Sequence, residues 1–571
     1  MFINIRCLFY IMKYQDFSFS ELSPKEFSVG LKIGLVNAIK HEGKCRPGTI
    51  ISGLLGEFDD LRSRLKKAGK DISVLASKIN KLSLDEQLML AESLYPGSLD
   101  SPEEKGMFDS LGLPHDGSVI TAFPPGPEKY PHIGHAKALF VNHELARSHK
   151  GKFFLRFEDT NPRLVKKEFY DAMIEDFKWL GVDWDDVHYA SDHFELFYDI
   201  FEKMISAGEA YICELSQDEF AEIKDKGGEI PSRSEDAHLQ LEKWKLLKRG
   251  EIEAVGRLKI DLNHQNSTMR DPVAFRLIKA HSHPMVSKEI VLFPSYDFQN
   301  SILDGYYGIT HRYRSKEFEM RRELQALIQK RAGFNVTNIR EFARFELEGS
   351  VNSGREIREK IKSGEISGWD HPSLSTLRAL KRRGIASEVI KEFVLKTGLS
   401  KNEAKITWNE LFILSRRFQD DKAPRRFFVR NPKKVDLKGV SNKVSLRSLP
   451  SGDLDRSFAL NDHVWLDEQD FNSLKEGFVY RLLGGINCKY VDGSLVYLDE
   501  NIDTFKEKGE MTIHYVVDGA CADANLLMPT GEWLKGKCES NEDIPTGSIL
   551  QFERLGFVRK DSKTAFWYAH K

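Results

Sequence analysis

The chain has 571 residues, with 84 Lys and Arg against 86 Asp and Glu, so its formal net charge at pH 7 is −2. This length is sufficient for several domains. The near balance of charge excludes a uniformly basic nucleic-acid binder, although local basic faces would be enough to bind RNA.

Six cysteines are scattered along the chain without a CxxC pair. Their spacing favours reduced thiols in a cytoplasmic protein and predicts neither a disulfide framework nor a structural zinc site. No apolar run is long enough for a membrane span. Residues 1–11 are only mildly apolar and lack a small-residue cleavage site, which argues against a signal peptide. We expect residues 1–16 to be disordered or to arise from a mis-assigned start codon.

The first domain that the sequence predicts is helical and covers residues 17–112. Apolar residues recur at spacings of three and four over 29–39 and over 50–67. Ser83 is the candidate N-cap of a further helix. Pro and Gly residues between 96 and 102 then break the helical pattern.

The next region alternates short buried strands with amphipathic helices, which predicts a mostly parallel Rossmann-type sheet with ligands at the strand carboxyl ends. A polar, irregular stretch at 214–284 is interpreted as an α/β insertion that divides this domain into 113–213 and 285–335. We expect the parallel sheet to resume at 290–294. The expected strands are 118–123 and 152–157, and the expected helices are 136–149, 166–180 and 194–208.

The remaining chain changes character twice. Residues 336–424 are helical and basic, and residues 425–571 carry short β-branched and aromatic runs typical of one or two β-barrels. The predicted fold is therefore multidomain: an N-terminal helical region, an α/β core with an insertion, a helical region and a C-terminal all-β region.

The most informative motif is PHIGHAKAL at 131–139, which stands between a strand with a Pro-rich turn and a predicted helix. A helix start directs free N–H groups at the turn and favours an anion, so phosphate is the expected ligand. Gly134 would let a flat ring approach the backbone. His132 and His135 can donate hydrogen bonds to a phosphate as it gains charge. A surface loop with two incidental histidines is the alternative interpretation.

Five motifs in order resemble the class I aminoacyl-tRNA synthetases of the glutamyl/glutaminyl subclass, in their archaeal-type glutamyl form. The resemblance covers nearly the whole chain beyond about the first 25 residues. The motifs are 131–139, 157–162 (FEDTNP), 295–300 (SYDFQN) with 308–317, 368–384 and 547–556.

The resemblance implies activation of L-glutamate by ATP, with Mg²⁺ as part of the ATP complex, and transfer to the terminal ribose of tRNA(Glu). tRNA(Gln) is a second candidate acceptor. It also implies that 214–284 binds the acceptor stem, that 336–424 holds a degenerate KMSKS-like loop and contacts the stem, and that 425–571 binds the anticodon. Other translation factors are candidate partners of the N-terminal region.

Arg314 is the residue that discriminates between substrates. An arginine can pair bidentately with a second carboxylate, whereas the glutaminyl members carry a small neutral residue there. A surface ion pair with Glu317 or Glu319 is the alternative. The resemblance places Glu158 against the substrate ammonium.

The remaining site residues are also assigned by resemblance. Tyr296 and Asn300 lie one helical turn apart and are candidates for the glutamate pocket, with a core position as the alternative for Tyr296. The catalytic candidates are His132, His135 and Arg355, and the same residues with Pro125, Gly134 and Ser353 are the candidates for ATP binding. The tRNA-binding candidates are Asp304, Arg378, Lys381, Arg382 and Arg383, for the last four of which a solvated helix face is the alternative.

Three positions depart from the family pattern. Ala122 stands where the family has an arginine that contacts the amino acid, and Gly354 stands where it has a loop lysine that stabilises the phosphates. Arg355 is the candidate substitute for that lysine. Glu128-Lys129 replaces a pair of small residues. These departures leave a weakly active tRNA-binding paralogue as a second hypothesis, and a glutaminyl-tRNA synthetase, disfavoured by Arg314, as a third.

Overall fold

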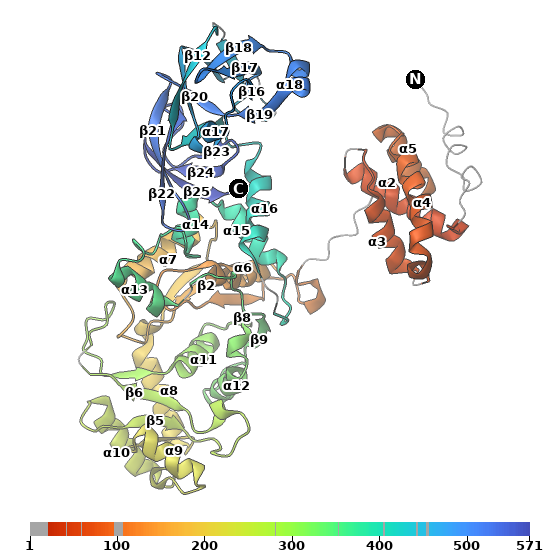
Figure 1. The fold of residues 1–571 in the computed structure, drawn as a ribbon. Helices are drawn as coiled ribbons and strands as arrows, with labels where there is room; N and C mark the ends of the chain where they lie inside the picture. Colours follow the sequence, from red (N-terminus) through yellow and green to blue (C-terminus); the bar gives the residue numbers. More distant parts are fainter. Residues whose placement is uncertain are drawn as a thin grey trace. The chain divides into compact units, whose positions relative to one another are not determined.

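The structure, a computed structural model, describes residues 21–571 apart from 42, 59, 96–106, 280, 352, 404–405, 441–442, 451 and 453–455. The chain forms two compact units, Met1–Gly112 and Leu113–Lys571 (Figure 1). The expectation for residues 1–16 and the predicted break at 96–102 lie outside the described residues. Within the described part of the chain, no helix combines the length and the apolar character needed to cross a membrane.

The N-terminal unit is helical, as predicted. Its helices are α2 (Pro24–Lys40), α3 (Pro47–Glu57), α4 (Leu61–Ile79) and α5 (Leu84–Leu94). The predicted cap of α5 is confirmed: the Glu86 amide donates to Ser83 Oγ at 3.3 Å, and the Ser83 amide donates to the Glu86 carboxylate at 2.8 Å. Such a reciprocal pair satisfies two backbone donors at a helix start.

The single helical segment expected over 50–67 is wrong, because the chain turns between α3 and α4. Phe58 adopts an extended conformation (φ −132°, ψ 96°) and ends α3. Leu54 and Leu61, on either side of the turn, are both fully buried in the same apolar core. The apolar spacing therefore continues across the turn and conceals it.

The parallel sheet of the second unit is confirmed. Strands β1 (Ile120–Phe123), β2 (Lys152–Phe157) and β3 (Asp186–Tyr189) pair in parallel, as do β8 (His311–Ser315) and β9 (Asn338–Phe342). The Thr310 amide donates to the Ile120 carbonyl at 2.9 Å and so places β8 beside β1. Helices α6 (Ile133–Ser148), α7 (Lys167–Trp179) and α8 (Phe194–Ser206) lie close to their predicted bounds.

The expectation that this sheet resumes at 290–294 is wrong. Strand β7 (Leu292–Pro294) pairs antiparallel with β6 (Val273–Leu277) and completes the sheet of the insertion, β4 (Ala210–Cys213)–β5 (Val255–Leu258)–β6–β7. Helices α9 (Gln217–Asp225) and α10 (Ala237–Lys248) belong to the same insertion. Parallel pairing returns in the separate two-stranded sheet β8–β9, which lies beside β1 and ends at Phe342, seven residues beyond the predicted boundary at 335.

Helices connect and cover these sheets. Helix α11 (Tyr296–Tyr306) begins two residues after β7, and α12 (Arg321–Arg331) lies between β8 and β9 in the chain. The helical region that follows contains α13 (Gly354–Ser363), α14 (Leu377–Arg383), α15 (Ser387–Lys396) and α16 (Trp408–Gln419).

The C-terminal region is all-β in its framework, as predicted, and contains two seven-stranded sheets. The first holds β10 (Arg425–Arg426), β23 (Ile549–Phe552), β24 (Gly556–Lys560), β25 (Ala565–His570), β21 (Cys521–Leu527), β22 (Trp533–Glu539) and β11 (Phe428–Arg430). The second holds β19 (Gly509–Ile513), β16 (Val479–Leu482), β17 (Ile486–Val491), β18 (Ser494–Asp499), β12 (Lys433–Lys438), β15 (His463–Leu466) and β20 (Tyr515–Val517). A ribbon of β13 (Lys443–Leu446) and β14 (Arg456–Ala459) and the short helices α17 (Glu468–Asn472) and α18 (Ile502–Lys508) complete it. Within Leu113–Lys571, the insertion and these sheets lie at opposite ends of the parallel sheet (Figure 1).

Candidate active site

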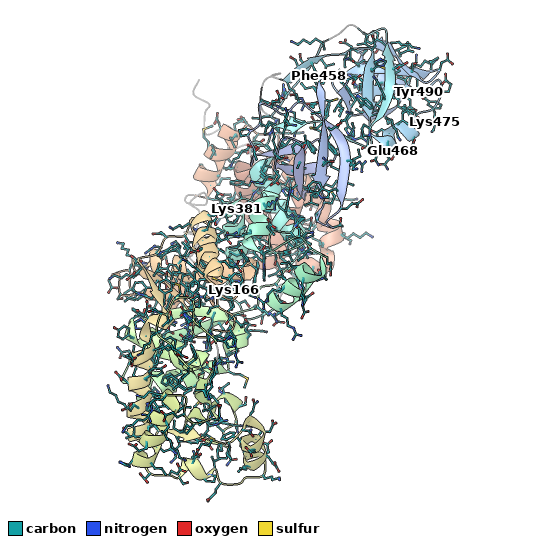
Figure 2. The ribbon with its side chains drawn as sticks, turned by 90° about the vertical axis from the view of Figure 1, so that its left-hand side faces the viewer. Lys166, Lys381, Phe458, Glu468, Lys475 and Tyr490 are labelled. Carbon is teal, nitrogen blue, oxygen red and sulfur yellow. The ribbon has the colours of Figure 1, made fainter. Side chains whose placement is uncertain are left out.

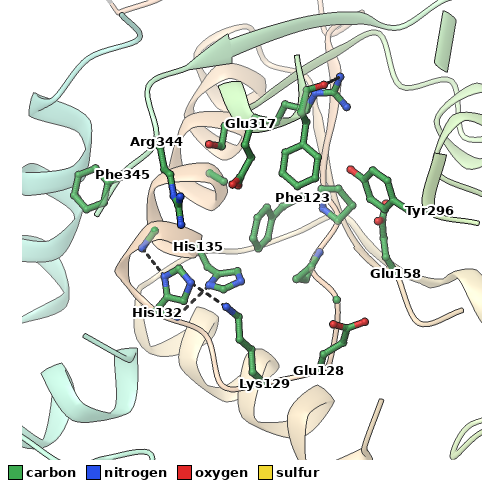
Figure 3. A pocket seen from close by; sticks show the side chains of 18 of the residues that line it. Phe123, Glu128, Lys129, His132, His135, Glu158, Tyr296, Glu317, Arg344 and Phe345 are labelled. Carbon is green, nitrogen blue, oxygen red and sulfur yellow. Dashed lines mark hydrogen bonds between the residues drawn. The ribbon is translucent and has the colours of Figure 1, made fainter. Parts of the chain in front are cut away.

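A cavity of about 1000 Å³ opens beside the start of α6 and the carboxyl ends of β1 and β2 (Figure 3). It brings together predicted residues from distant parts of the chain, and β8 and the segment after β9 line its remaining walls. The predicted residues on its walls are Pro125, His132, Gly134, His135, Glu158, Tyr296, Arg314 and Ser353. The predicted residues that do not line it are Asn300, Asp304, Arg355, Arg378, Lys381, Arg382 and Arg383.

The Pro-rich turn after β1 is held by the chain that follows β2. The Glu158 amide donates to the Pro125 carbonyl at 2.9 Å, and the Lys166 amide donates to the Pro127 carbonyl at 3.3 Å. Prolines at these positions restrict the turn without loss of these bonds, because carbonyl groups alone are needed there. The turn therefore presents Glu128 and Lys129 to the cavity in a fixed position.

The two histidines of the HIGH motif cap their own helix. His132 is the N-cap of α6, and its Nδ1 accepts from the Gly134 amide at 3.1 Å. His135 Nδ1 accepts from the His132 amide at 3.1 Å, and the Ile133 amide donates to the Ser375 carbonyl at 3.0 Å. The expectation that free N–H groups at this helix start face the ligand is therefore wrong.

The same bonds fix which ring nitrogen carries a proton. A neutral imidazole has one donor and one acceptor, and Nδ1 is the acceptor in both rings, so Nε2 carries the hydrogen. Burial lowers the pKa of His132 well below its ordinary value and that of His135 to about 3, and the nearby Lys129 adds to both shifts. Both rings are thus neutral at physiological pH and offer Nε2–H donors.

Gly134 serves close packing at the start of α6. A Cβ at this position would lie 2.9 Å from the His132 ring and 3.1 Å from the Phe345 carbonyl oxygen. The first approach is too close for a Cβ and the second is tight, so glycine permits the histidine cap and the segment after β9 to meet there.

Residues 375–377 form backbone hydrogen bonds with the turn that carries the HIGH motif. The Leu377 amide donates to the Pro131 carbonyl at 2.9 Å, and His132 and Thr376 form an isolated β-bridge. The Tyr130 and Trp369 rings lie 5.4 Å apart. The motif at 368–384 therefore has a structural role at the site, which its sequence did not reveal.

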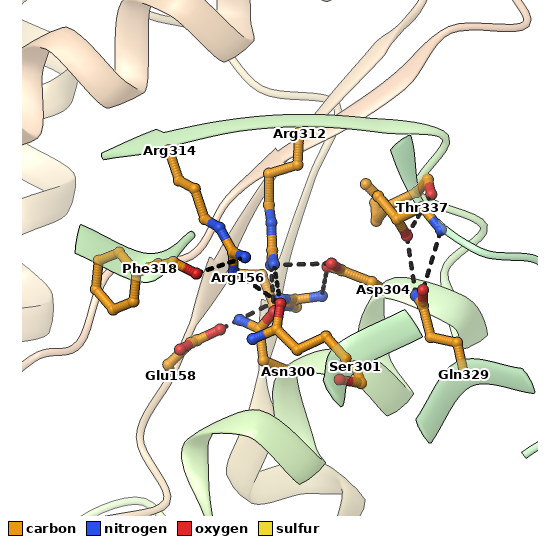
Figure 4. Close-up of polar contacts among 12 residues, drawn as sticks. Arg156, Glu158, Asn300, Ser301, Asp304, Arg312, Arg314, Phe318, Gln329 and Thr337 are labelled. Carbon is orange, nitrogen blue, oxygen red and sulfur yellow. Dashed lines mark hydrogen bonds and ion pairs between the residues drawn. The ribbon is translucent and has the colours of Figure 1, made fainter. Parts of the chain in front are cut away.

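Arg314 also lines this cavity, and Figure 4 shows its polar contacts. Its side chain is 7% exposed and donates to Gln325 Oε1 at 2.7 Å and to the Phe318 carbonyl at 3.0 Å. Among the residues that the structure describes, it has no ion pair with a carboxylate, so the alternative of a pair with Glu317 or Glu319 is wrong. Burial, aided by Arg312, lowers its pKa to about 10, which still leaves it charged at neutral pH.

A buried charge cluster supports this end of the cavity. Asp304 is 1% exposed and pairs with Arg156 at 2.7 Å and with Arg312 at 2.9 Å. Asn300 accepts a hydrogen bond from Arg312 (Figure 4). Asn300 and Asp304 thus lie behind Arg312 and position it, which argues against the direct substrate and tRNA contacts expected of them.

Glu158 and Tyr296 face the cavity beside this cluster. Glu158 accepts from Arg156 at 3.3 Å, and burial raises its pKa to about 8 against the opposing effect of Arg156. Tyr296 is half-buried on the cavity wall, with its ring 5.6 Å from that of Phe318. Burial and the nearby Glu158 raise its pKa to about 12, so it remains a neutral donor. The cavity position excludes a purely core role for Tyr296.

Comparisons with known proteins agree with this geometry. Residues 118–418, more than half of the chain, match the family model described as tRNA synthetases class I (E and Q), catalytic domain, and 423–505 match the anti-codon binding domain of the same group. The chain belongs to this family.

Similar proteins cover almost its full length. "Glutamate--tRNA ligase" of Pyrococcus furiosus is 34% identical over 569 residues, and that of Pyrococcus abyssi is 35% identical over 570, each spanning 95% of this chain and 99% of the relative. That of Methanothermobacter thermautotrophicus is 33% identical over 95% of this chain and 98% of its own. A crystal structure of a glutamate tRNA ligase from Elizabethkingia meningosepticum matches 53% of this chain and 69% of its own at 19% identity, and its TM-score of 0.37 is too low to carry a conclusion.

The loop region of this class I synthetase departs from the expected arrangement. Arg355 lies in the first turn of α13 with its side chain 86% exposed, and it pairs with Glu359 at 3.0 Å. Ser353 lines the cavity and caps α13 by accepting from the Glu356 amide at 3.4 Å. In this geometry Arg355 does not reach the cavity, so it does not replace a loop lysine.

The basic helix α14 of this synthetase is largely used for packing. Arg383 is 3% exposed and donates to the Pro372 and Ala569 carbonyls at 3.1 and 2.5 Å. Arg382 pairs with Asp370 and Asp561, and Arg378 pairs with Glu175. These placements argue against tRNA contact by Arg383 and against a simply solvated face. Lys381 (Figure 2) is 41% exposed and lies 4.0 Å from Glu175, the longest ion-pair distance of the four basic residues.

Several residues at the site escaped the sequence analysis. Gln325, on α12, accepts from Arg314 and donates to Asp297 at 3.0 Å, but it lies in no recognisable motif. Arg276 and Arg344 line the cavity from outside every motif. Ala122 is fully buried and lies away from the cavity wall, which β1 reaches through Phe123 instead. No sequence signal beyond residue type could have identified Gln325, Arg276 or Arg344.

Proposed function

We propose that this protein is a glutamate–tRNA ligase, which activates L-glutamate with ATP and transfers the glutamyl group to the 3′-terminal ribose of tRNA. The observation that carries the proposal is the buried guanidinium of Arg314, which lacks a carboxylate partner in the described structure and shares a cavity with the HIGH histidines. A buried arginine without a carboxylate favours an anionic ligand, because a neutral amide would leave its charge uncompensated.

The relatives support this assignment over the two alternatives. They are named Glutamate--tRNA ligase and span nearly the entire chain. They lend no support to a glutaminyl-tRNA synthetase or to a catalytically weak tRNA-binding paralogue.

Different residues of the cavity would bind the different charged groups of glutamate. The Arg314 fork would hold the side-chain carboxylate of glutamate, and ionised Glu158 would hold its ammonium group. The α-carboxylate would then point toward the α-phosphate of ATP beside His132 and His135. Their Nε2–H groups would stabilise the charge that develops on the phosphate as pyrophosphate leaves. This chemistry needs positioning and donors and no covalent enzyme intermediate.

Mg²⁺ is proposed as part of the ATP substrate. Among the described residues, no group of three or more His, Cys, Asp or Glu side chains could hold a metal ion. Magnesium retains several waters and commonly binds through substrate phosphates, so we expect the ion to arrive with the nucleotide.

Binding of tRNA is proposed to use both ends of the second unit. The family match at 423–505 supports anticodon binding by the β-sheets, and the insertion at the opposite end would receive the acceptor stem. Lys381 would contact a phosphate. The proposed acceptor is tRNA(Glu), and tRNA(Gln) is a second candidate. The proposed location is the cytoplasm. The N-terminal unit is proposed to contact other translation factors.

The test is aminoacylation by the purified protein with ATP and Mg²⁺, with glutamate or glutamine, on tRNA(Glu) and on tRNA(Gln). Charging with glutamate is expected on tRNA(Glu). No charging with either amino acid would overturn the proposal, and charging with glutamine would overturn the argument from Arg314. His132→Ala should lower the rate of adenylate formation and leave tRNA binding almost unchanged.

A further inference from the structure

One amide on α12 holds two arginines of the cavity wall. Gln325 is 1% exposed, and its Oε1 accepts from Arg314 at 2.7 Å and from Arg312 at 3.2 Å. Both arginines line the cavity, and both come from β8 (Figure 4). An amide oxygen has two lone pairs, so the two guanidiniums use this acceptor fully. The orientation of each guanidinium therefore depends on the same side chain.

The other half of the same amide faces an acid. Gln325 Nε2 donates to Asp297 Oδ1 at 3.0 Å, and Asp297, on α11, also forms an ion pair with Arg321. The opposite orientation of the amide would set its NH2 group against two guanidiniums and its oxygen against a carboxylate. The neighbours of Gln325 therefore permit one orientation, with the oxygen toward the arginines.

The amide also separates the negative charge of Asp297 from the positive charge of Arg314. Arg312 has a carboxylate partner, Asp304, at 2.9 Å, whereas Arg314 has none among the described residues. A carboxylate in the place of the Gln325 amide would pair with Arg314 and compensate its charge. A neutral acceptor orients the guanidinium and leaves its charge available to an anionic ligand.

We infer that Gln325 is a positioning residue that determines specificity: it orients Arg314 and, because it is neutral, leaves the charge of Arg314 available for the side-chain carboxylate of glutamate. This inference rests on the proposed function, because it names a further residue that acts in the same glutamate pocket. Gln325 does not itself line the cavity. We therefore expect it to affect the binding of glutamate through Arg314 and not the binding of ATP.

The first test replaces two buried glutamines of α12 by methionine, one at a time. The matched control is Gln329, which lies one turn beyond Gln325, is also 1% exposed, and forms two hydrogen bonds with Thr337 at 2.9 and 3.0 Å (Figure 4). Gln325→Met should raise KM for glutamate about tenfold, as expected for a lost hydrogen bond to a charged group, with little change in kcat or in KM for ATP. Gln329→Met should lower the thermal unfolding midpoint to a similar extent and leave both KM values at those of the parent.

Three results of this test would contradict the inference. One is an equal KM for glutamate in Gln325→Met and in the parent. Another is an equal rise in Gln329→Met, because the effect would then follow from the packing of α12. The third is a parallel rise in KM for ATP in Gln325→Met, because the substitution would then have disturbed the whole cavity.

The second test exchanges the acid and the amide. The double variant Asp297→Asn/Gln325→Glu keeps the net charge and a hydrogen bond between the two side chains, and places the carboxylate beside Arg314. Its pairing with Arg314 should lower the ratio of kcat/KM for glutamate to that for glutamine about tenfold to a hundredfold. The thermal unfolding midpoint should not fall, because the buried charge of Arg314 gains a partner.

Asp297→Asn alone is the control for the exchange. It keeps a neutral side chain at 325 and should lower the ratio less than the double variant does. A ratio in the double variant as high as in Asp297→Asn would show that the neutrality of residue 325 has no effect on specificity, and would overturn the inference.

The inference and the proposed function can fail separately. Charging of tRNA with glutamate by the parent, together with an unchanged KM in Gln325→Met, would refute the inference alone. If the parent binds glutamate in a calorimetric titration but does not charge tRNA, the proposed function fails. A weaker affinity of Gln325→Met for glutamate in that titration would still support the inference, and an equal affinity would refute it as well.

Discussion

Arg314 is held by neutral acceptors, Gln325 Oε1 and the Phe318 carbonyl, which orient its guanidinium without neutralising it. We expect Arg314→Cys to lower kcat/KM for glutamate about tenfold to a hundredfold, the usual range for a charge-assisted hydrogen bond. The kcat/KM of Arg314→Lys should lie between those of Arg314→Cys and the parent, since lysine keeps the charge but cannot donate two parallel hydrogen bonds. Aminoacylation kinetics at several glutamate concentrations measure both. An unchanged preference for glutamate over glutamine in Arg314→Cys would place the pocket elsewhere.

Glu158 should make glutamate binding depend on pH. Burial raises its pKa to about 8, so a large part of it is protonated at neutral pH in the free protein. The substrate ammonium binds the carboxylate form, and KM for glutamate should therefore fall as pH rises through about 8. Glu158→Gln should have a higher KM for glutamate, and its KM should not fall as pH rises through this range. The same pH profile in both proteins would assign the titration to another group.

Single residues were predictable where their chemistry is distinctive. A fork-shaped cation and an acid in known motifs identified Arg314 and Glu158, and both lie on the cavity wall. The contacts of Lys129 and Gln325 were not predictable, because they depend on the approach of α13 and α12 from elsewhere in the chain. The same holds for Arg355, whose charge suggested a role that its direction on α13 does not permit.

At the scale of elements, α14 joins the catalytic region to the first C-terminal sheet. Arg383 donates to the carbonyl of Ala569 in β25, and Arg382 pairs with Asp561 in the loop before β25. Replacement of Arg383 by Met would leave two carbonyls without a donor and should lower the free energy of unfolding by about 1–3 kcal/mol. Thermal unfolding measures this. Arg417→Met, which removes an exposed pair with Glu392, should have little effect.

Ser83 should matter for the N-terminal helices alone. Ser83→Ala removes one side of the capping box of α5 and should destabilise the N-terminal unit by about 1 kcal/mol. Ser73→Ala, an exposed serine within α4, is the control and should be neutral or slightly stabilising. Hydrogen exchange at the α5 amides would distinguish them, and equal protection in the two variants would contradict the role of the cap.

Elements were predictable where the local pattern and the partner coincide. The helices α6, α7 and α8 were found within a few residues of their bounds. Helices α7 and α8 each bury one face at helical spacing, whereas α6 is buried around most of its circumference. The prediction for strand β7 names the wrong sheet, because an apolar run indicates that a strand is buried and does not indicate which strand it pairs with. The turn between α3 and α4 was missed for a related reason, since both helices bury residues in one core.

At the scale of the whole molecule, the described residues on the cavity wall belong to Leu113–Lys571. Within the part of the chain that the structure describes, the apolar core of the N-terminal unit is built from residues 22–95. A chain that begins at Leu113 should therefore fold and exchange pyrophosphate into ATP at the rate of the full protein. Loss of exchange in a truncated chain that remains folded would show that the first unit contributes to the site.

The order of domains was predictable from changes in periodicity and composition along the chain. A helical unit, an interrupted parallel sheet, a helical region and an all-β region all occur in the predicted order. The boundaries of the insertion were not predictable, because its sheet includes strands on both sides of the polar stretch. Chain order alone does not record which strands share a sheet.

The histidine caps of α6 also make the beginning of that helix sensitive to acid. A proton on Nδ1 of either ring would remove the acceptor of a backbone amide and loosen the first turn. Because the pKa of each histidine is depressed in the folded protein, the stabilisation from the neutral rings is complete above the ordinary histidine pKa and declines as pH falls toward the folded values. Acid should thus fray this turn as it weakens the fold, and ¹⁵N resonances of the two rings should keep the signature of an unprotonated Nδ1 until that occurs.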